Sequence, residues 1–300
     1  MSDSRPSVVV VGVDGSKESM VAARWAADEA VRRQLTLRLI HAFTVPIVGV
    51  PAYGIPPDFT EGMQAAGRAA LDAAVAEIRQ SHPDVALTEE LVNYDPRPAL
   101  VEASAEAALT VVGTRGGGRI PEVVLGSVAL HVAAHGRSPV AVIAPNHARS
   151  TKGIVLLGVD GSGTSEAAVA YAFDEAALRG AQLDAVLVWD DIAMHGFARG
   201  AADLGVLEDQ EEHAVLAEQL AGWREKYPDV PVRQLVLRGR PAEVLLKYAA
   251  DQPAGLPPQM VVVGSRGRGG LTGLLLGSTS QRLICHAQWP VVVVRRESSG

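Results

Sequence analysis

Residues 8–16 read VVVVGVDGS, and residues 154–162 read IVLLGVDGS, at an offset of 146 positions. The stretch WAADEAVRRQLTL (25–37) returns as YAFDEAALRGAQL (171–183) at that same offset. Shorter matches, such as HPDV and YPDV or RPALV and RPAEV, follow in the same order in both halves. Repetition of this length indicates one structural unit written twice along the chain.

The chain has room for two domains of ordinary size. It has 300 residues, and a domain typically takes ~150 residues. The polar stretch NHARSTK (146–152) separates the two copies, so we predict domains at residues 1–147 and 153–300. An apolar content of 48% favours packed helices and strands. The formal net charge of −7 offers no basic field, so we expect no nucleic-acid partner.

The sequence indicates a cytoplasmic protein without a membrane partner. No stretch approaches the ~18 consecutive apolar residues of a membrane-spanning helix, and the N-terminus lacks the apolar region of a signal peptide. The one cysteine, Cys285, can form no disulfide within a single chain, which fits a reducing compartment.

Each copy alternates strand-like and helix-like patterns. The β-branched run at 8–13 leads into Asp-Gly-Ser, a turn and helix-start combination. Apolar residues then recur at helical spacing, from Ala23 to Val31 and again from Val169 to Ala177. Apolar strands separated by helices predict an α/β fold with a parallel sheet covered on both faces. Ligands of such sheets bind at the carboxyl ends of the strands, where the strand order reverses.

Two glycine segments follow the fourth strand-like run of each copy. VVGTRGGGRIPEVVLGS (111–127) and VVVGSRGRGGLTGLLLGS (261–278) share one spacing: glycine, two residues, glycine, nine residues, Gly-Ser. Glycine lets backbone amides turn toward a ligand, and a helix N-terminus after Gly-Ser would add further N–H groups. The repeated spacing therefore predicts two phosphate-binding sites. Four arginines would supply positive charge there: Arg115, Arg119, Arg266 and Arg268.

The repeat and the glycine spacing resemble the universal stress protein family, specifically its actinobacterial (mycobacterial-type) members with two tandem domains that bind ATP. The resemblance covers essentially the whole chain. It implies two tandem Rossmann-like domains of the adenine nucleotide alpha hydrolase type, each with a five-stranded parallel sheet flanked by helices. It also implies ATP as the ligand, with Mg²⁺ held only through the ATP phosphates.

The resemblance implies one ATP site in each domain. In the first, Asp14 would contact the adenosine, Gly12 and Val13 would line the base, and the Ala42 backbone would meet the adenine edge. The ribose and phosphates would be bordered by Val112, Gly113, Arg115, Gly116, Gly126, Ser127, Val128 and Ala129. The second site would use Gly158, Val159, Asp160, Val188, Val263, Gly264, Arg266, Gly267, Gly277, Ser278, Thr279 and Ser280. The residues alone leave another role open for Asp14 and Asp160, because aspartate at a strand-to-helix junction is also a common cap or turn former.

Other kinds of site are disfavoured. GVDGSK (12–17) has the wrong spacing for a P-loop, and no G-x-G-x-x-G follows either first strand. His131 and His135 lie four apart on a helix, but the second copy has Arg282 and His286 there. With no third ligand evident, we expect a packed or solvated helix face and no metal site.

Two acidic pairs recur in the helix after the first strand of each copy, Asp28-Glu29 and Asp174-Glu175. Adjacent helix positions point about 100° apart, which makes such pairs poor partners for acid-base chemistry. We expect them on a solvated helix face, and we predict no catalytic residues.

The leading hypothesis is a nucleotide-dependent regulator of the stress response or of growth, with at most weak ATP hydrolysis. A slow ATPase or adenylate-handling enzyme stays open as an alternative, and so does an interaction scaffold with vestigial sites. The loops at 44–60 and 190–208 follow the second strands and are candidate lids over the adenine.

The last strand-like runs, PVAVIAP (139–145) and PVVVVRR (290–296), are expected at a sheet edge, which invites pairing. The resemblance implies that these strands join the two domains as an internal pseudo-dimer. A homodimer of the chain is also expected, and the sequence does not identify a regulatory protein partner.

Overall fold

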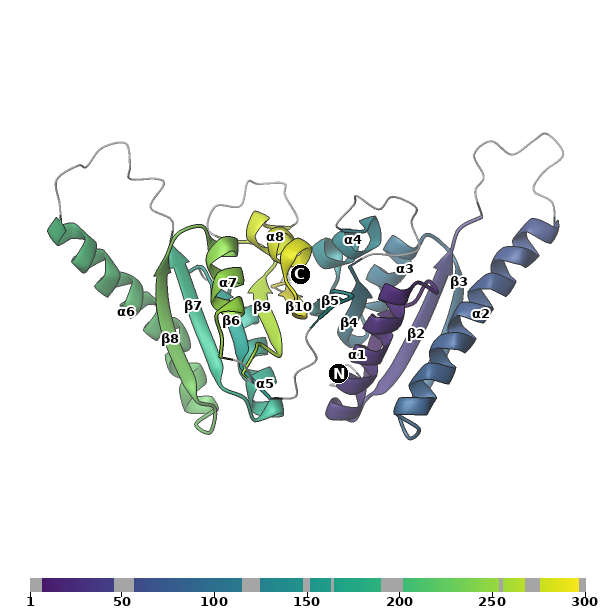
Figure 1. The fold of residues 1–300 in the computed structure, drawn as a ribbon, viewed down its shortest axis with the longest axis horizontal. Helices are drawn as coiled ribbons and strands as arrows, with labels where there is room; N and C mark the ends of the chain where they lie inside the picture. Colours follow the sequence, from purple (N-terminus) through teal and green to yellow (C-terminus); the bar gives the residue numbers. More distant parts are fainter. Residues whose placement is uncertain are drawn as a thin grey trace, which may run out of the picture. The chain divides into compact units, whose positions relative to one another are not determined.

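The computed structural model describes residues 7–45, 57–114, 125–147, 152–162, 165–189, 202–253, 256–267 and 276–296. The chain divides into two compact units, Met1–Pro145 and Asn146–Gly300. The division falls at the start of the NHARSTK stretch that separates the two sequence copies. Figure 1 shows the helices and strands of each unit.

The first unit alternates strands with helices along the chain. Its strands are β1 (Val8–Gly12), β2 (Thr36–Phe43), β3 (Leu87–Asn93), β4 (Ala107–Gly113) and β5 (Val140–Ile143). Its helices are α1 (Lys17–Arg33), α2 (Pro57–Ser81), α3 (Pro96–Ala103) and α4 (Ser127–His135). The strands lie in the order β3-β2-β1-β4-β5, and every neighbouring pair is parallel.

The second unit repeats this arrangement. Its strands are β6 (Val155–Val159), β7 (Leu183–Trp189), β8 (Val232–Arg238), β9 (Met260–Gly264) and β10 (Val291–Val294). Its helices are α5 (Glu166–Arg179), α6 (Ala202–Lys226), α7 (Pro241–Ala250) and α8 (Ser278–His286). The order β8-β7-β6-β9-β10 is again parallel throughout, which confirms the predicted tandem α/β fold.

The strand order reverses beside the first strand of each unit. In the first unit the chain runs outward through β1, β2 and β3, then returns to place β4 on the other side of β1. Helices α1 and α2 pack against each other, and α3 packs against α4, so the two pairs cover opposite faces of the sheet (Figure 1). The loops after β1 and β4 therefore meet at the carboxyl edge, where a ligand crevice is expected.

Local signals determine where α1 begins and where both α1 and α5 end. The Ser16 hydroxyl caps α1 by accepting from the Ser19 N–H, 3.1 Å away. Helices α1 and α5 each end at a residue in the left-handed conformation, Gln34 (φ 55°) and Gly180 (φ 57°), at matching positions of the two copies. Their N–H groups donate to carbonyls of the last helical turn, so the same cap forms from different residues.

The prediction that the acidic pairs lie on a solvated helix face is wrong for one member of each pair. Glu29 is 1% exposed and Glu175 is fully buried. Each is neutralised by the arginine one helical turn later, at 3.3 Å from Arg33 and 3.0 Å from Arg179. The reason is the position of α1 and α5, which pack against several strands and also against the neighbouring long helix. A buried carboxylate is tolerated there because it is paired.

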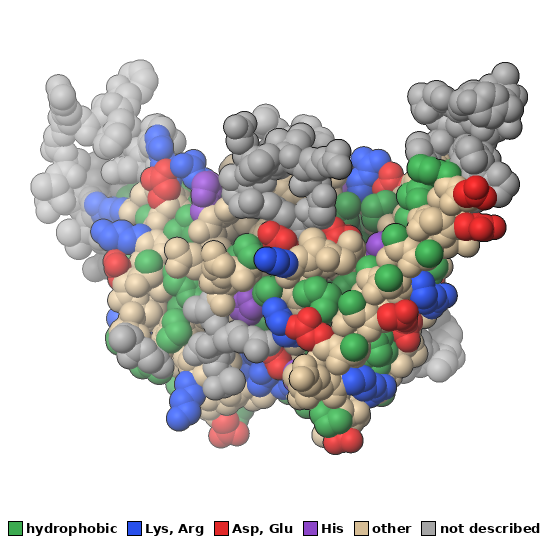
Figure 2. Space-filling view, turned by 45° about the vertical axis from the view of Figure 1, so that its right-hand side comes forward, with side chains coloured by type: hydrophobic (Ala, Val, Ile, Leu, Met, Phe, Trp, Pro, Cys, Tyr) green, Lys and Arg blue, Asp and Glu red, His purple; other side chains and the backbone are tan. Residues whose placement is uncertain are grey.

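The exposed surface carries charges of both signs. On the face shown in Figure 2, acidic and basic side chains are interspersed among apolar and neutral ones. Within the described parts of the chain, no helix is both long enough and apolar enough to cross a membrane.

A glycine in the first strand of each unit allows the third helix to approach closely. A Cβ atom at Gly12 would lie 2.8 Å from Leu100 Cδ1 of α3, and one at Gly158 would lie 2.8 Å from Leu245 Cδ1 of α7. Both leucines are almost fully buried, at 3% and 2% exposed. These contacts seat α3 and α7 against the sheet next to the carboxyl edge.

We predict that Gly12→Ala destabilises the protein by about 1–3 kcal/mol, because the new methyl group overpacks against Leu100. Thermal and denaturant unfolding of the full chain would measure the change. Adding Leu100→Ala should make the Gly12→Ala effect smaller, because the two side chains then no longer compete for space.

Gly62→Ala is the matched control for this prediction. Gly62 lies in α2 with no atom within 4 Å of a Cβ at that position. Alanine there should stabilise the helix by about 0.5–1 kcal/mol. Equal unfolding midpoints for the Gly12 and Gly62 variants would contradict the packing role of Gly12.

Candidate functional site

Both glycine loops are closed at their base by the same backbone hydrogen bond. In the first unit the Gly126 N–H donates to the Thr114 carbonyl at 2.7 Å. In the second unit the Gly277 N–H donates to the Ser265 carbonyl, also at 2.7 Å. Thr114 and Ser265 directly follow β4 and β9, and both are buried. The bond therefore brings each helix N-terminus back to the carboxyl end of the strand that precedes the loop.

The helices that begin there present free backbone amides to this edge. Gly126 and Gly277 are the N-caps of α4 and α8, and neither forms a side-chain cap hydrogen bond. The first intrahelical bonds are donated by Leu130 and Gln281. Three earlier N–H groups per helix have no intrahelical acceptor, and no acidic residue lies in either first turn. Amides and helix dipole together favour an anion at this position.

The predicted phosphate-side residues share one pattern in both units. In each first helical turn, residue one is exposed, residue two is half-buried and residue three is buried. These residues are Ser127, Val128 and Ala129 in α4, and Ser278, Thr279 and Ser280 in α8. The first two positions of each helix are therefore accessible to a ligand.

Each first strand ends in an aspartate loop at the same edge. Gly15 (φ 80°) and Gly161 (φ 72°) adopt left-handed conformations that favour glycine, which explains the Asp-Gly-Ser sequence. The Ser16 N–H donates to Asp14 Oδ1 at 3.0 Å, and the Ser162 N–H donates to Asp160 Oδ1 at 3.0 Å. Both aspartates thus form turns, a role that the residues alone had left open.

In the second unit the structure brings the aspartate and the glycine loop together. A Cβ atom at Gly267 would lie 3.0 Å from Asp160 Oδ2, which is tighter than an ordinary contact. Gly267 and Asp160 are separated by more than a hundred positions in the sequence. The carboxylate and the backbone of the loop therefore line one place at the carboxyl edge.

The other predicted residues divide between strand ends, packing positions and the surface. Gly12 and Gly158 pack under α3 and α7, and Arg266 is exposed at the start of its loop. Arg115 and Gly116 lie outside the described residues, as do Arg119, Arg268 and parts of the candidate lids. Strand-end residues that are buried or half-buried are Val13, Ala42, Val112, Gly113, Val159, Val188, Val263 and Gly264.

Sequence reasoning missed His41 at the end of β2. Its imidazole lies under α2, where a Cβ at Gly67 would be 2.8 Å from His41 Cδ2. Its Nδ1 is buried and has no hydrogen-bond partner. Burial lowers the pKa of His41, against smaller opposing effects of the Val13 backbone and the Asp14 carboxylate. The sequence did contain a signal for this residue. His41 is a polar residue in an otherwise apolar strand, at the position where the second copy has Leu187.

Two other side chains near the second site were also missed. The Gln219 amide of α6 donates to the Ser162 carbonyl at 3.2 Å, and so reaches the aspartate loop. Arg238, at the end of β8, stacks over the Trp189 indole with its Cζ 4.7 Å from the ring centroid. The first unit has Phe43 and Asn93 at the corresponding paired positions of its strands. The two carboxyl edges therefore differ in chemistry.

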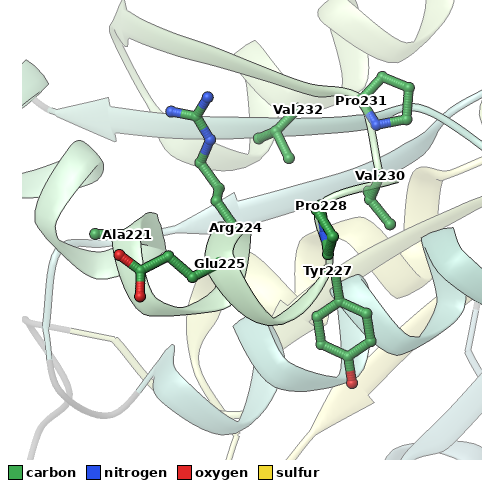
Figure 3. Close-up of a pocket in the computed structure, with 8 residues that line it drawn as sticks. All are labelled: Ala221, Arg224, Glu225, Tyr227, Pro228, Val230, Pro231 and Val232. Carbon is green, nitrogen blue, oxygen red and sulfur yellow. The ribbon is translucent and has the colours of Figure 1, made fainter.

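An open pocket of ≈ 580 Å³ lies elsewhere on the second unit (Figure 3). Arg224, Glu225 and Tyr227 come from the end of α6 and the turn after it, and Val232 comes from the start of β8. Because the strands are parallel, this is the amino edge of the sheet, opposite to the glycine loop. We assign this pocket no part in the candidate site.

The histidine pair on α4 forms no metal centre with other described residues. The His131 and His135 rings stack with centroids 4.1 Å apart, and His135 Nδ1 lies 2.9 Å from the His131 carbonyl oxygen. Across the described ranges, no group of three or more His, Cys, Asp and Glu side chains is placed to hold a metal ion.

Comparison with known proteins agrees with this architecture. The model of the universal stress protein family matches residues 7–144 and 153–295. The chain is 40% identical to Universal stress protein Rv2005c of Mycobacterium tuberculosis, over 96% of this chain and 97% of that protein. It is 37% identical to Universal stress protein Rv2623 of the same organism, over 98% and 99% of the two chains.

A solved structure supports the fold over nearly the full length. The crystal structure of a universal stress protein from Archaeoglobus fulgidus covers 98% of this chain and 97% of its own, with a TM-score of 0.68 at 19% identity. At that identity the likeness concerns the fold alone. The two family matches and the mycobacterial relatives show that this chain belongs to the universal stress protein family and contains two copies of its domain.

Proposed function

We propose that each unit binds one ATP at the carboxyl edge of its sheet, and that the protein acts as a nucleotide-dependent regulator of stress response or growth. The observation that carries this proposal is the convergence in the second unit of the Asp160 carboxylate, the Gly267 backbone and the α8 N-terminus. The carboxylate can accept hydrogen bonds from hydroxyl groups, and the backbone N–H groups can donate to phosphate oxygens. A nucleoside triphosphate needs both, because its ribose carries hydroxyl groups and its other end carries phosphates.

The phosphate end of the ligand fits the first turn of α8. The N–H groups of Ser278, Thr279 and Ser280 precede the first intrahelical donor, Gln281. Ser278 is exposed and Arg266 is exposed at the start of the loop, so a hydroxyl and a guanidinium are accessible to a polyanion. Charge-assisted hydrogen bonds of this kind are the strong ones.

The ribose end fits the aspartate. Asp160 is half-buried beside the glycine loop, and a carboxylate accepts hydrogen bonds from ribose hydroxyls. The base would then lie toward the ends of the first two strands, where Val159 and Val188 are buried. In the first unit Asp14, Val13 and Ala42 occupy the equivalent positions.

Mg²⁺ would be held through the phosphates. Magnesium commonly keeps several water ligands and binds substrate phosphates with one or two carboxylates. We assign Asp160 to the ribose, so the protein itself would supply no ligand to the ion. We propose that the ion accompanies ATP rather than binding the protein alone.

We propose regulation rather than catalysis because the polar groups at the second site serve to hold structure. Ser162 donates to Asp160, and the Ser280 hydroxyl donates to the Gly264 carbonyl at 2.7 Å. Hydrolysis would require a general base that lies within reach of the attacking water and can take its proton. The hydrogen bonds of Asp160 and Ser280 give these side chains a structural role. Occupancy by ATP would instead change what the protein binds or how stable it is.

The decisive measurement is to release nucleotide from the purified protein by denaturation, identify it, and follow phosphate production by the native protein with Mg-ATP. We expect two ATP per chain and negligible turnover. Sustained multiple turnover would replace the regulator with an ATPase. No bound nucleotide, and no binding of added Mg-ATP, would favour a scaffold with vestigial sites.

We predict that Gly267→Ala weakens ATP binding at the second site by roughly tenfold, equivalent to about 1.4 kcal/mol. The added methyl group would crowd Asp160 Oδ2 at 3.0 Å and displace either the carboxylate or the loop. Calorimetric titration of the full chain should show one weakened site and one unchanged site. By its matching place in the spacing, Gly116→Ala should weaken the first site.

Gly222→Ala provides the control for the glycine substitutions. Gly222 lies in α6, and a Cβ there would have no atom within 4 Å. Both ATP affinities should remain unchanged in this variant. Unchanged affinity in Gly267→Ala and Gly116→Ala as well would remove the phosphate-cradle argument.

A further inference from the structure

The two sites share a backbone frame but differ in two side chains of the second unit, the half-buried Gln219 and the buried Ser280. Helices α2 and α6 each have 25 residues and align at an offset of 145 positions, so Ala74 of the first copy corresponds to Gln219 of the second. Helices α4 and α8 each have nine residues and align at an offset of 151 positions, so Ala129 corresponds to Ser280. At both positions the second unit has a hydrogen-bonding side chain where the first unit has a methyl group.

Gln219 holds the aspartate loop of the second unit. Its Nε2 donates to the Ser162 carbonyl at 3.2 Å, and the Ser165 hydroxyl donates to the same carbonyl at 2.7 Å. Ser162 in turn donates its N–H and its hydroxyl to Asp160 Oδ1, at 3.0 and 2.7 Å. A continuous chain of hydrogen bonds thus runs from α6 to the carboxylate.

Part of this chain of hydrogen bonds recurs in the first unit, where the Ser19 hydroxyl donates to the Ser16 carbonyl and the Ser16 N–H donates to Asp14 Oδ1, both at 3.0 Å. The remaining groups are arranged differently. Ala74 is fully buried and its side chain can donate no hydrogen bond. The Ser16 hydroxyl accepts from the Ser19 N–H as the cap of α1, whereas the Ser162 hydroxyl donates to Asp160. Asp14 is exposed, while Asp160 is half-buried. The difference between the two aspartate loops therefore lies in the Gln219 amide, which Ala74 cannot replace, and in the Ser162 hydroxyl, which donates to the Asp160 carboxylate.

Ser280 holds the other wall of the second site. Its hydroxyl donates to the Gly264 carbonyl at 2.7 Å, which ties the third residue of α8 to the start of the glycine loop. Ser280 is 3% exposed, and the equivalent Ala129 is 2% exposed, so both occupy the same packed position. Alanine leaves the first loop without this tie.

We propose that the two nucleotide sites are unequal, that the second unit binds ATP more tightly and fills first, and that Gln219 and Ser280 are the positioning residues responsible. This inference rests on the proposed function. A group that is already immobilised loses less conformational freedom when a ligand binds, so a preorganised site binds more tightly. From the usual free-energy loss on ordering a side chain, we expect a difference of about three- to tenfold in Kd.

Unequal sites give the protein an intermediate state. As the ATP concentration rises, the chain passes from mostly empty, to forms in which the second unit is occupied more often than the first, to occupied in both units. A partner that distinguishes these states would respond at two nucleotide concentrations instead of one.

The test compares single-site variants of the full chain by calorimetric titration with Mg-ATP. Asp14→Ala leaves the second site, Asp160→Ala leaves the first, and the former should bind about three- to tenfold more tightly. In the Asp14→Ala background, Ser280→Ala and the similarly shaped Gln219→Met should each raise Kd. In the Asp160→Ala background, Ala129→Ser should lower Kd, because it adds the missing donor.

Thermal unfolding without nucleotide separates positioning from simple stability. If Ser280→Ala lowers the unfolding midpoint but leaves Kd unchanged, and Ala129→Ser has no effect on Kd, the positioning role is overturned. Equal affinities in the two single-site variants, or tighter binding in the first unit, overturn the inequality while leaving the proposed function intact. A wild-type chain that binds no ATP overturns both.

Discussion

The closure of the glycine loop by one backbone hydrogen bond is the constraint on which each site depends. Thr114 and Ser265 are fixed by pairing with the last strand of their unit, since their N–H groups donate to the carbonyls of Ile143 and Val294. Their own carbonyls then accept from the N-cap glycine of the next helix. A helix N-terminus is thereby seated at the carboxyl edge of a parallel sheet, beside the aspartate loop from the first strand.

Main-chain contacts preserve this frame while side chains diverge. Loop closure, left-handed aspartate loops and strand order are the same in both units, because they depend on backbone groups and glycine conformations. His41 of the first copy corresponds to Leu187 in the second copy. Alanines of the first copy correspond to Gln219 and Ser280. The two candidate sites therefore share one architecture but differ in side-chain chemistry, since a side chain at the edge can differ while the hydrogen-bonded frame stays the same.

The glycines of each unit serve three physically different purposes. Gly12 lets a leucine of α3 approach the sheet, Gly15 supplies a left-handed turn, and Gly267 leaves space beside a carboxylate. All three read alike in the sequence because none has a side chain. Glu29 shows that a charged side chain can also mislead. The sequence predicted that it would be exposed to solvent on its helix, but the fold buries it beside Arg33.

Local and periodic features of the sequence were enough to determine the duplication, the alternation of strands and helices, the α/β class and the glycine spacing. They were sufficient because strand and helix periodicity and turn preferences act over a few residues. Only the tertiary structure decided which acidic residues are buried, which glycines serve packing, and that Gln219 supports an aspartate loop 57 positions away. Those outcomes depend on which distant segments the sheet order brings together, and no local pattern records that pairing.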